Sequence, residues 1–470
     1  LSFALFKAGA VPVLIDPGMG IKNLERCLAE AEPEAFLGIP RAQLARRLLG
    51  WGKQTIRIAL TVAPGPSWTR IRAAGPPDEP YSIAPTRPDE LAAILYTSGS
   101  TGAPKGAVYT HAIFTAQVAI LRDLYGIGPG EVDLCTFPLF ALFGPALGMT
   151  SIVPEMDATR PARVDPTKIL AAIDDFGVTN MFGSPALIRR VGDFGAACGV
   201  TLPTLRRVIS AGAPVPAQVL ERFAAMLGPE ARIFTPYGAT EALPVCSIGS
   251  DEILGETRRA TDRGAGVCVG RPVGGARVAV IRISDDPIAT WSDDLLVPDG
   301  TVGEIVVQGP IVTRAYFQRP EATALAKIID PRAGQGGFWH RMGDLGYRDD
   351  RGRIWFCGRK AHRVVTANGT LFTTPCEAVF DTHPEVARTA LVGVGPPGAM
   401  RPVLCVEPAH RLGRPDRERL RRELLDRGAM HIHTREIATV LFHPAFPVDI
   451  RHNAKIFRET LAAWAARRLA

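Results

Sequence analysis

The sequence predicts an α/β protein with a large N-terminal domain of doubly wound sheets, a β-rich subdomain and a small C-terminal α/β domain. Three observations support this fold class: helix and strand patterns alternate in the N-terminal part, short alternating strands replace them from Val278 onward, and a helix–strand pattern returns near the C-terminus. At 470 residues the chain exceeds one typical domain of roughly 100–200 residues. Its 46% hydrophobic and 21% charged residues are typical of a globular protein and exclude a disordered one.

Helix–strand pairs recur in the N-terminal part of the chain. Apolar periodicity predicts a helix over residues 2–8, followed by a short buried strand over residues 11–15. Three further helix–strand pairs are expected at residues 22–32 and 35–38, 165–176 and 180–182, and 216–227 and 233–235. Such alternation predicts a largely parallel sheet covered on both faces. Because the chain begins without Met inside the first helix, we expect it to lack an N-terminal segment.

The C-terminal half contains two further kinds of structure. Short alternating strands punctuated by Gly and Pro are typical of antiparallel sheet, and they are expected at residues 277–283, 303–308 and 353–357. Beyond them, strands are expected at residues 389–394 and 403–407, and helices over the Arg-rich run 411–427 and over residues 457–469. The predicted domains are therefore residues 1–358 and residues 359–470.

Charge and cysteine usage narrow the class of function. Lys and Arg total 54 against 47 Asp and Glu, for a net charge of +7. Acidic residues interrupt the densest basic run, which indicates the solvated face of an amphipathic helix and no nucleic-acid partner. Eight cysteines are scattered without metal-binding spacing, so we expect reduced thiols and a cytoplasmic location.

The one long uncharged stretch, residues 134–154, has the length of a membrane span. Pro and Gly interrupt it at Pro138, Gly144, Pro145 and Gly148, and no basic flank follows closely. We therefore predict that it is the wall of an apolar pocket in a protein that does not cross the membrane.

The strongest chemical signal is the segment Tyr96-Thr97-Ser98-Gly99-Ser100-Thr101-Gly102-Ala103-Pro104-Lys105-Gly106, directly after an expected strand at residues 91–95. Glycines let the main chain approach phosphate oxygens closely, and hydroxyls and a lysine add donors, so this pattern indicates an anion cradle. It differs from a Walker A loop, because the spacing from Gly102 to Lys105 is wrong and Gly106 stands where a hydroxyl residue is required.

This loop resembles the phosphate loop of the adenylate-forming superfamily, which includes acyl-CoA synthetases, luciferases and peptide-synthetase adenylation domains. Other segments resemble the superfamily's motifs in the same order: Ser210-Ala211-Gly212-Ala213-Pro214, Pro236-Tyr237-Gly238-Ala239-Thr240-Glu241, Gly303-Glu304-Ile305, Met342-Gly343-Asp344, Gly358-Arg359 and Asn453-Ala454-Lys455-Ile456. They span nearly the whole chain. The resemblance implies the adenylate-forming fold, in which residues 359–470 are a small lid domain.

The resemblance also implies ATP and Mg²⁺ as cofactors and a role for each motif residue. Thr97, Ser98, Gly99, Ser100, Thr101, Gly102 and Lys105 are expected to bind phosphate, and Gly212, Ala213, Pro214, Tyr237 and Gly238 the adenine side. Asp344 is expected to bind the ribose, and Arg359 to stand at the hinge. Glu241 and Thr97 are the expected metal ligands, and Lys455, Thr240 and Glu241 the catalytic residues. Activation of a carboxylate at the α-phosphorus of ATP needs such cations and donors, because negative charge accumulates there.

Within the superfamily, the sequence most resembles the β-lactone synthetases of bacterial long-chain olefin biosynthesis. The resemblance lies in residues 5–18, 137–148, 182–187, 358–364 and 446–455. It implies that a long-chain 2-alkyl-3-hydroxy acid is adenylated and cyclised to a cis-3,4-dialkyl β-lactone without coenzyme A. It also implies partners among the olefin-pathway enzymes, including a β-lactone decarboxylase.

Two departures from the common acyl-CoA synthetase pattern weaken a thioester-forming role. Ala361-His362 replaces the usual Lys-Asp pair of the hinge, and Ala141-Leu142-Phe143 replaces the expected aromatic-histidine gate. Two alternatives stay open at this point: a long-chain fatty-acyl-CoA or acyl-AMP ligase, and a non-catalytic member of a pathway complex.

Overall fold

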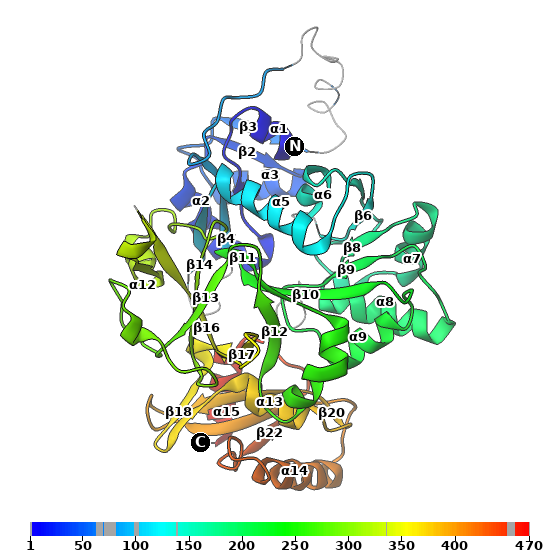
Figure 1. Cartoon of the computed structure of the whole chain (residues 1–470), viewed down its shortest axis with the longest axis vertical. Coiled ribbons are helices and arrows are strands. Elements are labelled where there is room, and N and C mark those ends of the chain that lie inside the picture. The colour runs from blue at the N-terminus through cyan, green and yellow to red at the C-terminus, as the bar shows by residue number, and fades with distance from the viewer. Residues whose placement is uncertain are drawn as a thin grey trace. The chain divides into compact units, whose positions relative to one another are not determined.

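Two units make up the fold of the computed structural model, which describes residues 2–62, 69, 81–97, 103–137, 140–334, 336–448 and 456–469 (Figure 1). The first unit comprises Leu1–Thr115 and Thr313–Thr323, and the second comprises Ala116–Val312 and Ala324–Ala470.

The first unit contains two small sheets. In the three-stranded sheet, β4 (Leu91–Thr97) lies between parallel β1 (Val13–Leu14) and antiparallel β5 (Lys105–Thr110). The other sheet pairs β2 (Ala35–Gly38) with β3 (Ile58–Thr61) in parallel. The helices of this unit are α1 (Ser2–Lys7), α2 (Ile21–Ala31), α3 (Pro40–Leu49) and the first residues of α5 (His111–Tyr125).

A twelve-stranded sheet forms the centre of the second unit. Its parallel half has the order β7-β6-β8-β9-β10, with bounds Thr150–Ile152, Val132–Cys135, Asn180–Phe182, Arg207–Ile209 and Arg232–Ala239. The helices between these strands are α6 (Phe143–Ala146), α7 (Pro166–Asp175), α8 (Pro185–Cys198) and α9 (Ala217–Ala224). This half contains two of the expected helix–strand pairs, α7 with β8 and α9 with β10, with ends shifted by a few residues.

Helices cover both faces of this parallel half. Val208 and Ile233 pack into a buried cluster with side chains of α7, α8 and α9. The next residues along the same strands, Ile209 and Phe234, pack instead against a cluster that includes residues of α5 and α6. Because successive strand residues point to opposite faces, the two clusters lie on opposite sides of the sheet. The sheet is therefore doubly wound, as predicted.

The other half of the large sheet is antiparallel. It continues from β10 through β11 (Ala242–Gly249), β12 (Val267–Pro272), β17 (Ile354–Arg359), β16 (Phe338–Arg348) and β14 (Gly303–Gln308) to β13 (Arg277–Ile281), and β15 (Lys327–Ile329) pairs with β16. The remaining helices of this region are α10 (Ser250–Glu252), a π-helical turn at Ile253–Thr257, α11 (Arg258–Asp262) and α12 (Pro320–Ala326). The three strands expected here form at β13, β14 and β17.

The C-terminal residues form an α/β arrangement with its own buried clusters. Its sheet has the order β20-β21-β22, with bounds Val386–Val394, Arg401–Pro408 and Val440–Phe442, and a hairpin joins β18 (Val364–Thr366) to β19 (Gly369–Leu371). The helices are α13 (Thr373–Asp381), α14 (Arg414–Ala429) and α15 (Arg458–Leu469). The Arg-rich run is a helix that buries Leu420 and Leu424, so its amphipathic character is confirmed.

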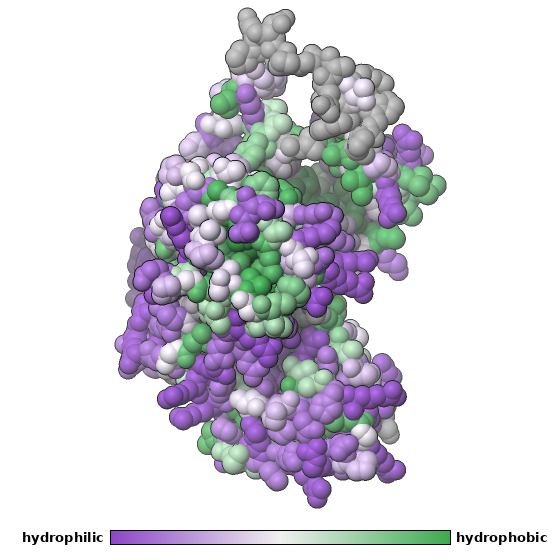
Figure 2. Space-filling view, turned by 90° about the vertical axis from the view of Figure 1, so that its right-hand side faces the viewer, coloured by the Kyte–Doolittle hydropathy of each residue, from purple (hydrophilic) through white to green (hydrophobic). Residues whose placement is uncertain are grey.

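Hydrophilic residues cover much of the face seen in Figure 2. In the part of the chain that the structure describes, no helix combines the length and the apolar character that a membrane crossing requires. All eight cysteines are among the described residues; seven are buried, and none of the eight forms a disulfide.

Candidate active site

A tight hairpin presents the two expected catalytic residues Thr240 and Glu241. Ala239 at the end of β10 pairs with Ala242 at the start of β11, so Thr240 and Glu241 form the two-residue turn between them. A side chain at Gly238 would come within 2.6 Å of the Ala242 carbonyl oxygen, so this close approach requires glycine. Residues 236–241 thus form the end of a strand and a half-buried turn that presents the Glu241 carboxylate.

Asp344 joins Tyr237 and Arg359 in one hydrogen-bonded group. The Tyr237 hydroxyl donates to Asp344 Oδ2 at 2.7 Å, and Arg359 Nη1 donates to Oδ1, also at 2.7 Å. The three residues come from β10, β16 and β17, and Asp344 lies directly opposite Arg359 in the β16–β17 register. Each carboxylate oxygen has a second lone pair, so Asp344 keeps capacity to accept further hydrogen bonds.

The pKa values of all three residues in this group are raised, by burial or by a neighbouring charge. Burial raises the pKa of Asp344, and the adjacent Arg359 guanidinium partly offsets that rise. The Asp344 carboxylate in turn raises the pKa of Arg359, and burial raises that of Tyr237 well above its ordinary value. Glu241 contributes to the electrostatic environment of both Asp344 and Arg359. The structure therefore brings Tyr237, Glu241, Asp344 and Arg359 into one site.

The motif at Gly303-Glu304-Ile305 supports the hinge region through an ion pair. Glu304 is fully buried and pairs with Arg341 Nη2 at 2.7 Å and with Lys360 Nζ at 3.1 Å. Lys360 directly follows Arg359, so Glu304 ties the residue after the expected hinge arginine to the antiparallel sheet.

The first unit holds the two described ends of the phosphate-loop segment. Thr97 ends β4 and Lys105 begins β5, and the two are direct partners in the antiparallel register. The Thr97 hydroxyl donates to the Lys105 carbonyl at 3.5 Å, and the Lys105 ammonium lies 5.1 Å from the centre of the Tyr316 ring. The strands thus hold the ends of the loop together. Ser98, Gly99, Ser100, Thr101 and Gly102 lie outside the described residues, as does Lys455.

The turn expected to contact adenine follows β9. Gly212 has a φ of +98°, a conformation that favours glycine, and Ala213 and Pro214 continue the turn. The Ser210 hydroxyl at the start of this turn is buried and has no hydrogen-bond partner among the described residues. An unpaired buried hydroxyl costs free energy, so this atom suits a ligand that can donate to it or accept from it.

The two residues that the sequence predicts as metal ligands have donor atoms that suit a hard cation. Carboxylate and hydroxyl oxygens are the ligands that Mg²⁺ prefers, and Glu241 and Thr97 supply one of each. The two residues belong to different units of the structure. Their chemistry fits the expected magnesium ion.

An apolar cavity lies in the second unit where the strand order of the parallel sheet reverses. The chain leaves β6 toward β7 on one side, whereas β8 lies on the other side of β6. Ligands of doubly wound proteins bind at such a reversal. The cavity has a volume of about 60 Å³, and its apolar lining includes Leu121, Phe143, Leu147, Met149 and Phe182. Part of the uncharged stretch at residues 134–154 therefore lines an apolar pocket, as predicted.

Three polar side chains that the motifs did not indicate also line this cavity. They are Gln117, Asp133 and Asn180, and each is at least nine-tenths buried. Asn180 Nδ2 donates to Asp133 Oδ1 at 2.5 Å, and burial raises the pKa of the Asp133 carboxyl. Asp133, a polar residue inside an otherwise apolar strand, is the sequence signal that could have indicated this group.

A buried lysine–histidine pair near Glu241 was also missed by the sequence reasoning. Lys327 and His340 are direct partners on β15 and β16, and Lys327 Nζ lies 3.1 Å from His340 Nδ1. Burial lowers the pKa of Lys327 to about 7, and Glu241 partly offsets that effect. No motif surrounds Lys327 in the sequence, so only the strand register reveals the pair.

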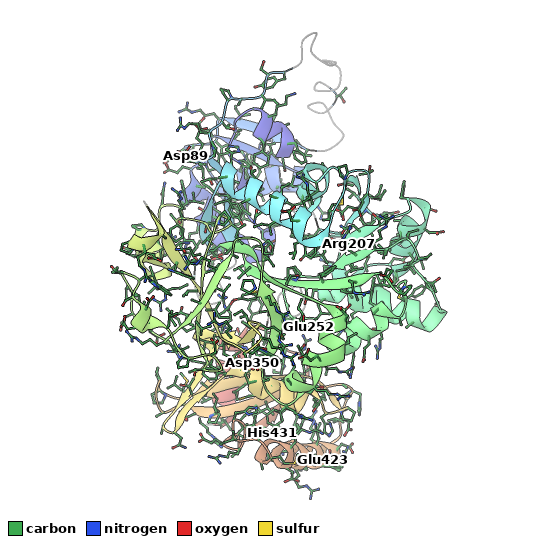
Figure 3. The ribbon with its side chains drawn as sticks, in the orientation of Figure 1. Asp89, Arg207, Glu252, Asp350, Glu423 and His431 are labelled. Carbon is green, nitrogen blue, oxygen red and sulfur yellow. The ribbon has the colours of Figure 1, made fainter. Side chains whose placement is uncertain are left out.

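One group of side chains elsewhere has spacing compatible with a metal ion. Among the residues that the structure describes, only His383, Glu385 and Glu423 form such a group, and Glu423 is labelled on α14 in Figure 3. Arg419 Nη1 lies 2.8 Å from Glu385 Oε2 and 3.1 Å from Glu423 Oε2. The Arg419 guanidinium already supplies positive charge beside the two carboxylates, so we interpret the group as an ion-pair network.

The chain is similar to known proteins over almost its whole length. The family model described as "AMP-binding enzyme" matches residues 1–317. The chain is 51% identical to an olefin β-lactone synthetase of Xanthomonas campestris pv. campestris, over 99% of this chain and 84% of that protein. A protein of the same name from Stenotrophomonas maltophilia is 50% identical, over 100% of this chain and 84% of its own length.

Solved structures show the same fold at low sequence identity. ATP-bound MatB from Rhodopseudomonas palustris superposes with a TM-score of 0.78 at 22% identity, covering 100% of this chain and 86% of that one. The predicted fold class is confirmed by this likeness.

Proposed function

The chain belongs to the AMP-binding enzyme family, and we propose that it is an ATP-dependent β-lactone synthetase of long-chain olefin biosynthesis. The observation that carries the proposal is the 51% identity with the Xanthomonas olefin β-lactone synthetase over nearly the whole chain. The proposed substrate is a long-chain 2-alkyl-3-hydroxy acid, and the products are a cis-3,4-dialkyl β-lactone, AMP and pyrophosphate.

In the first half-reaction, a carboxylate oxygen of the substrate attacks the α-phosphorus of ATP and pyrophosphate leaves. Lys105 and the phosphate-loop donors bind the phosphates, and Asp344, held by Tyr237 and Arg359, accepts hydrogen bonds from the ribose. Lys455 supplies positive charge between the two anionic reactants. Glu241 and Thr97 are the residues that would hold a Mg²⁺ ion, which would supply charge neutralisation for the phosphates.

In the second half-reaction, the 3-hydroxyl oxygen attacks the acyl carbon of the adenylate. The bond between that carbon and the AMP oxygen breaks, AMP leaves, and the hydroxyl proton is released. The nucleophile is tethered to the electrophile, so the site needs only to hold a reactive conformation and exclude water. The apolar cavity fits this requirement, although at about 60 Å³ it must widen to take long alkyl chains.

The decisive experiment is product identification with ATP, Mg²⁺ and a 2-alkyl-3-hydroxy acid, with and without coenzyme A. We expect pyrophosphate, AMP and a β-lactone in equal amounts, and no dependence on coenzyme A. Thioester formation from a simple fatty acid, with no lactone from the hydroxy acid, would instead identify a fatty-acyl-CoA ligase. The absence of any pyrophosphate release would favour a non-catalytic role.

Two further parts of the proposal concern the cell. The enzyme acts in the cytoplasm and associates with a β-lactone decarboxylase and other enzymes of the same pathway, because a strained lactone must be consumed soon after its release. Co-purification of the tagged chain with a β-lactone-consuming enzyme tests the association. Recovery of the chain alone under conditions that preserve other complexes contradicts it.

A further inference from the structure

We infer that Gln117 selects the substrate by accepting a hydrogen bond from its 3-hydroxyl group, an inference that rests on the proposed function. Gln117 lies on α5 and lines the apolar cavity at the reversal of strand order. It is 3% exposed, and its side-chain oxygen Oε1 is buried without a hydrogen-bond partner among the described residues.

A hydrogen bond to a residue distant in the sequence sets the orientation of the Gln117 amide. Gln117 Nε2 donates to the Leu243 carbonyl at 2.8 Å. This bond identifies the amide nitrogen and leaves Oε1, which can only accept, without a donor among the described residues. A buried acceptor without a donor costs free energy. A ligand that supplies an O–H group to this atom recovers that cost, whereas an aliphatic chain does not.

The position of Gln117 along the cavity matches the position of the hydroxyl in the substrate. Leu243 stands two residues beyond Glu241, on the strand that leaves the Thr240–Glu241 turn, and Pro236 and Leu243 also line the cavity. The 3-hydroxyl is only two carbons from the carboxylate, so it must bind near the reacting group. Its hydrogen bond to Leu243 places Gln117 beside the strand that leaves the Thr240–Glu241 turn, and Leu121 and Leu147 supply apolar walls that suit the alkyl chains.

The cavity lining contains a second acceptor without a hydrogen-bond partner among the described residues, and its neighbours differ from those of Gln117. Asn180 Oδ1 is also buried without a partner, but its amide nitrogen donates to Asp133, whose other oxygen accepts from the Cys135 thiol at 3.1 Å. This pair belongs to β8 and β6 and has no contact with the Glu241 hairpin in the described bonds. It therefore serves as an internal control for Gln117.

The test uses the whole chain and compares related acids as substrates for ATP-dependent pyrophosphate release. The acids are a 2-alkyl-3-hydroxy acid, the same acid without the hydroxyl, and its 3-methoxy ether. We expect the native protein to prefer the hydroxy acid by about tenfold or more in kcat/KM over both analogues, since neither can donate a hydrogen bond. Equal kcat/KM for the three acids would overturn the inference.

Substitution of the acceptor then identifies the residue. Gln117→Leu is expected to abolish the preference for the hydroxy acid, mainly through KM, while adenylation of the acid without the hydroxyl continues. The preference is a ratio measured on one sample, so it does not depend on the fraction of folded protein. The control Arg122→Gln, at an exposed residue of the same helix outside the cavity lining, is expected to keep this preference.

The outcomes separate this inference from the proposed function. If lactone forms but Gln117→Leu keeps the native preference, Gln117 does not select the hydroxyl and the proposed function stands. If Asn180→Leu abolishes the preference and Gln117→Leu does not, then Asn180, and not Gln117, selects the hydroxyl, and the inference is overturned. If the native chain adenylates no acid of this class, both fail.

Discussion

Arg359 donates a hydrogen bond of 2.7 Å to Asp344, so the residue expected at the hinge is bound to the residue expected at the ribose. The two lie opposite each other on neighbouring strands, and Tyr237 completes the group from a third strand. Because Arg359 ends β17 and the C-terminal α/β arrangement follows it, the residue expected at the ribose contacts the residue that leads into that arrangement.

Asp344→Asn removes the negative charge that Arg359 pairs with. We expect KM for ATP to rise at least tenfold, because the amide is a weaker acceptor for the ribose and the guanidinium loses its counter-charge. The free energy of unfolding should fall by about 1–3 kcal/mol. Steady-state kinetics and urea denaturation measure both effects.

Tyr237→Phe is the matched control for that change, since it removes one hydrogen bond and keeps the ring. The rise in KM for ATP in Tyr237→Phe should be several-fold smaller than the rise in Asp344→Asn. Native kinetics in the Asp344→Asn variant would contradict the assigned role of the carboxylate.

Lys455→Ala should suppress adenylation far more than ATP binding, because the ammonium acts mainly on the charge that develops in the transition state. We expect kcat for pyrophosphate release to fall about 100-fold or more, with the Kd for ATP changed only several-fold. Lys168→Ala, an exposed lysine paired with Glu155, is the control and should behave as the native protein. Equal fold-losses in ATP affinity and in kcat would contradict this role and would mean that Lys455 acts mainly in binding ATP in the ground state.

His362 should make stability depend on pH in the acid range. Its ring contacts Glu459 at 3.3 Å, and burial with the nearby Arg458 lowers its pKa from 6.5 to about 4. Between these values the unfolded chain binds a proton that the folded protein does not, so stability falls as the pH falls from 6.5 to 4. His362→Gln should remove on the order of 2 kcal/mol of that loss. Urea denaturation at pH 7 and pH 4.5 measures the free energy of unfolding of both proteins. An equal loss of stability between the two pH values in the native protein and in His362→Gln would refute this prediction.

Lys327 should have a corresponding effect on the alkaline side. Burial lowers its pKa from 10.5 to about 7, so the unfolded chain binds the extra proton between these values. The contribution of Lys327 to the free energy of unfolding is fully present above pH 10.5 and is lost as the pH falls to 7. Relative to Lys327→Met, the native protein should therefore gain on the order of 2–4 kcal/mol between pH 7 and pH 10. Denaturation of both proteins at the two pH values checks this, and a constant difference would mean that Lys327 stays protonated.

Much of the fold followed from local patterns. The strand at Ala35–Gly38 and the helix at Ser2–Lys7 are encoded by the period of their apolar residues, which depends only on neighbours in the chain. The motif residues could also be identified in the sequence, because glycine, hydroxyl and charged residues at set spacings report the chemistry of a loop directly.

The contacts that complete the site were decided by the tertiary structure. Tyr237 meets Asp344 from 107 residues away, and Gln117 meets Leu243 from 126 residues away. Lys327 lies beside His340 only because the register of β15 on β16 places the two residues opposite each other. A hydrophobic period states which face of an element is buried, but it does not state which side chain of another strand will lie opposite. That depends on register and packing across the whole sheet, and these are set only when the chain is folded.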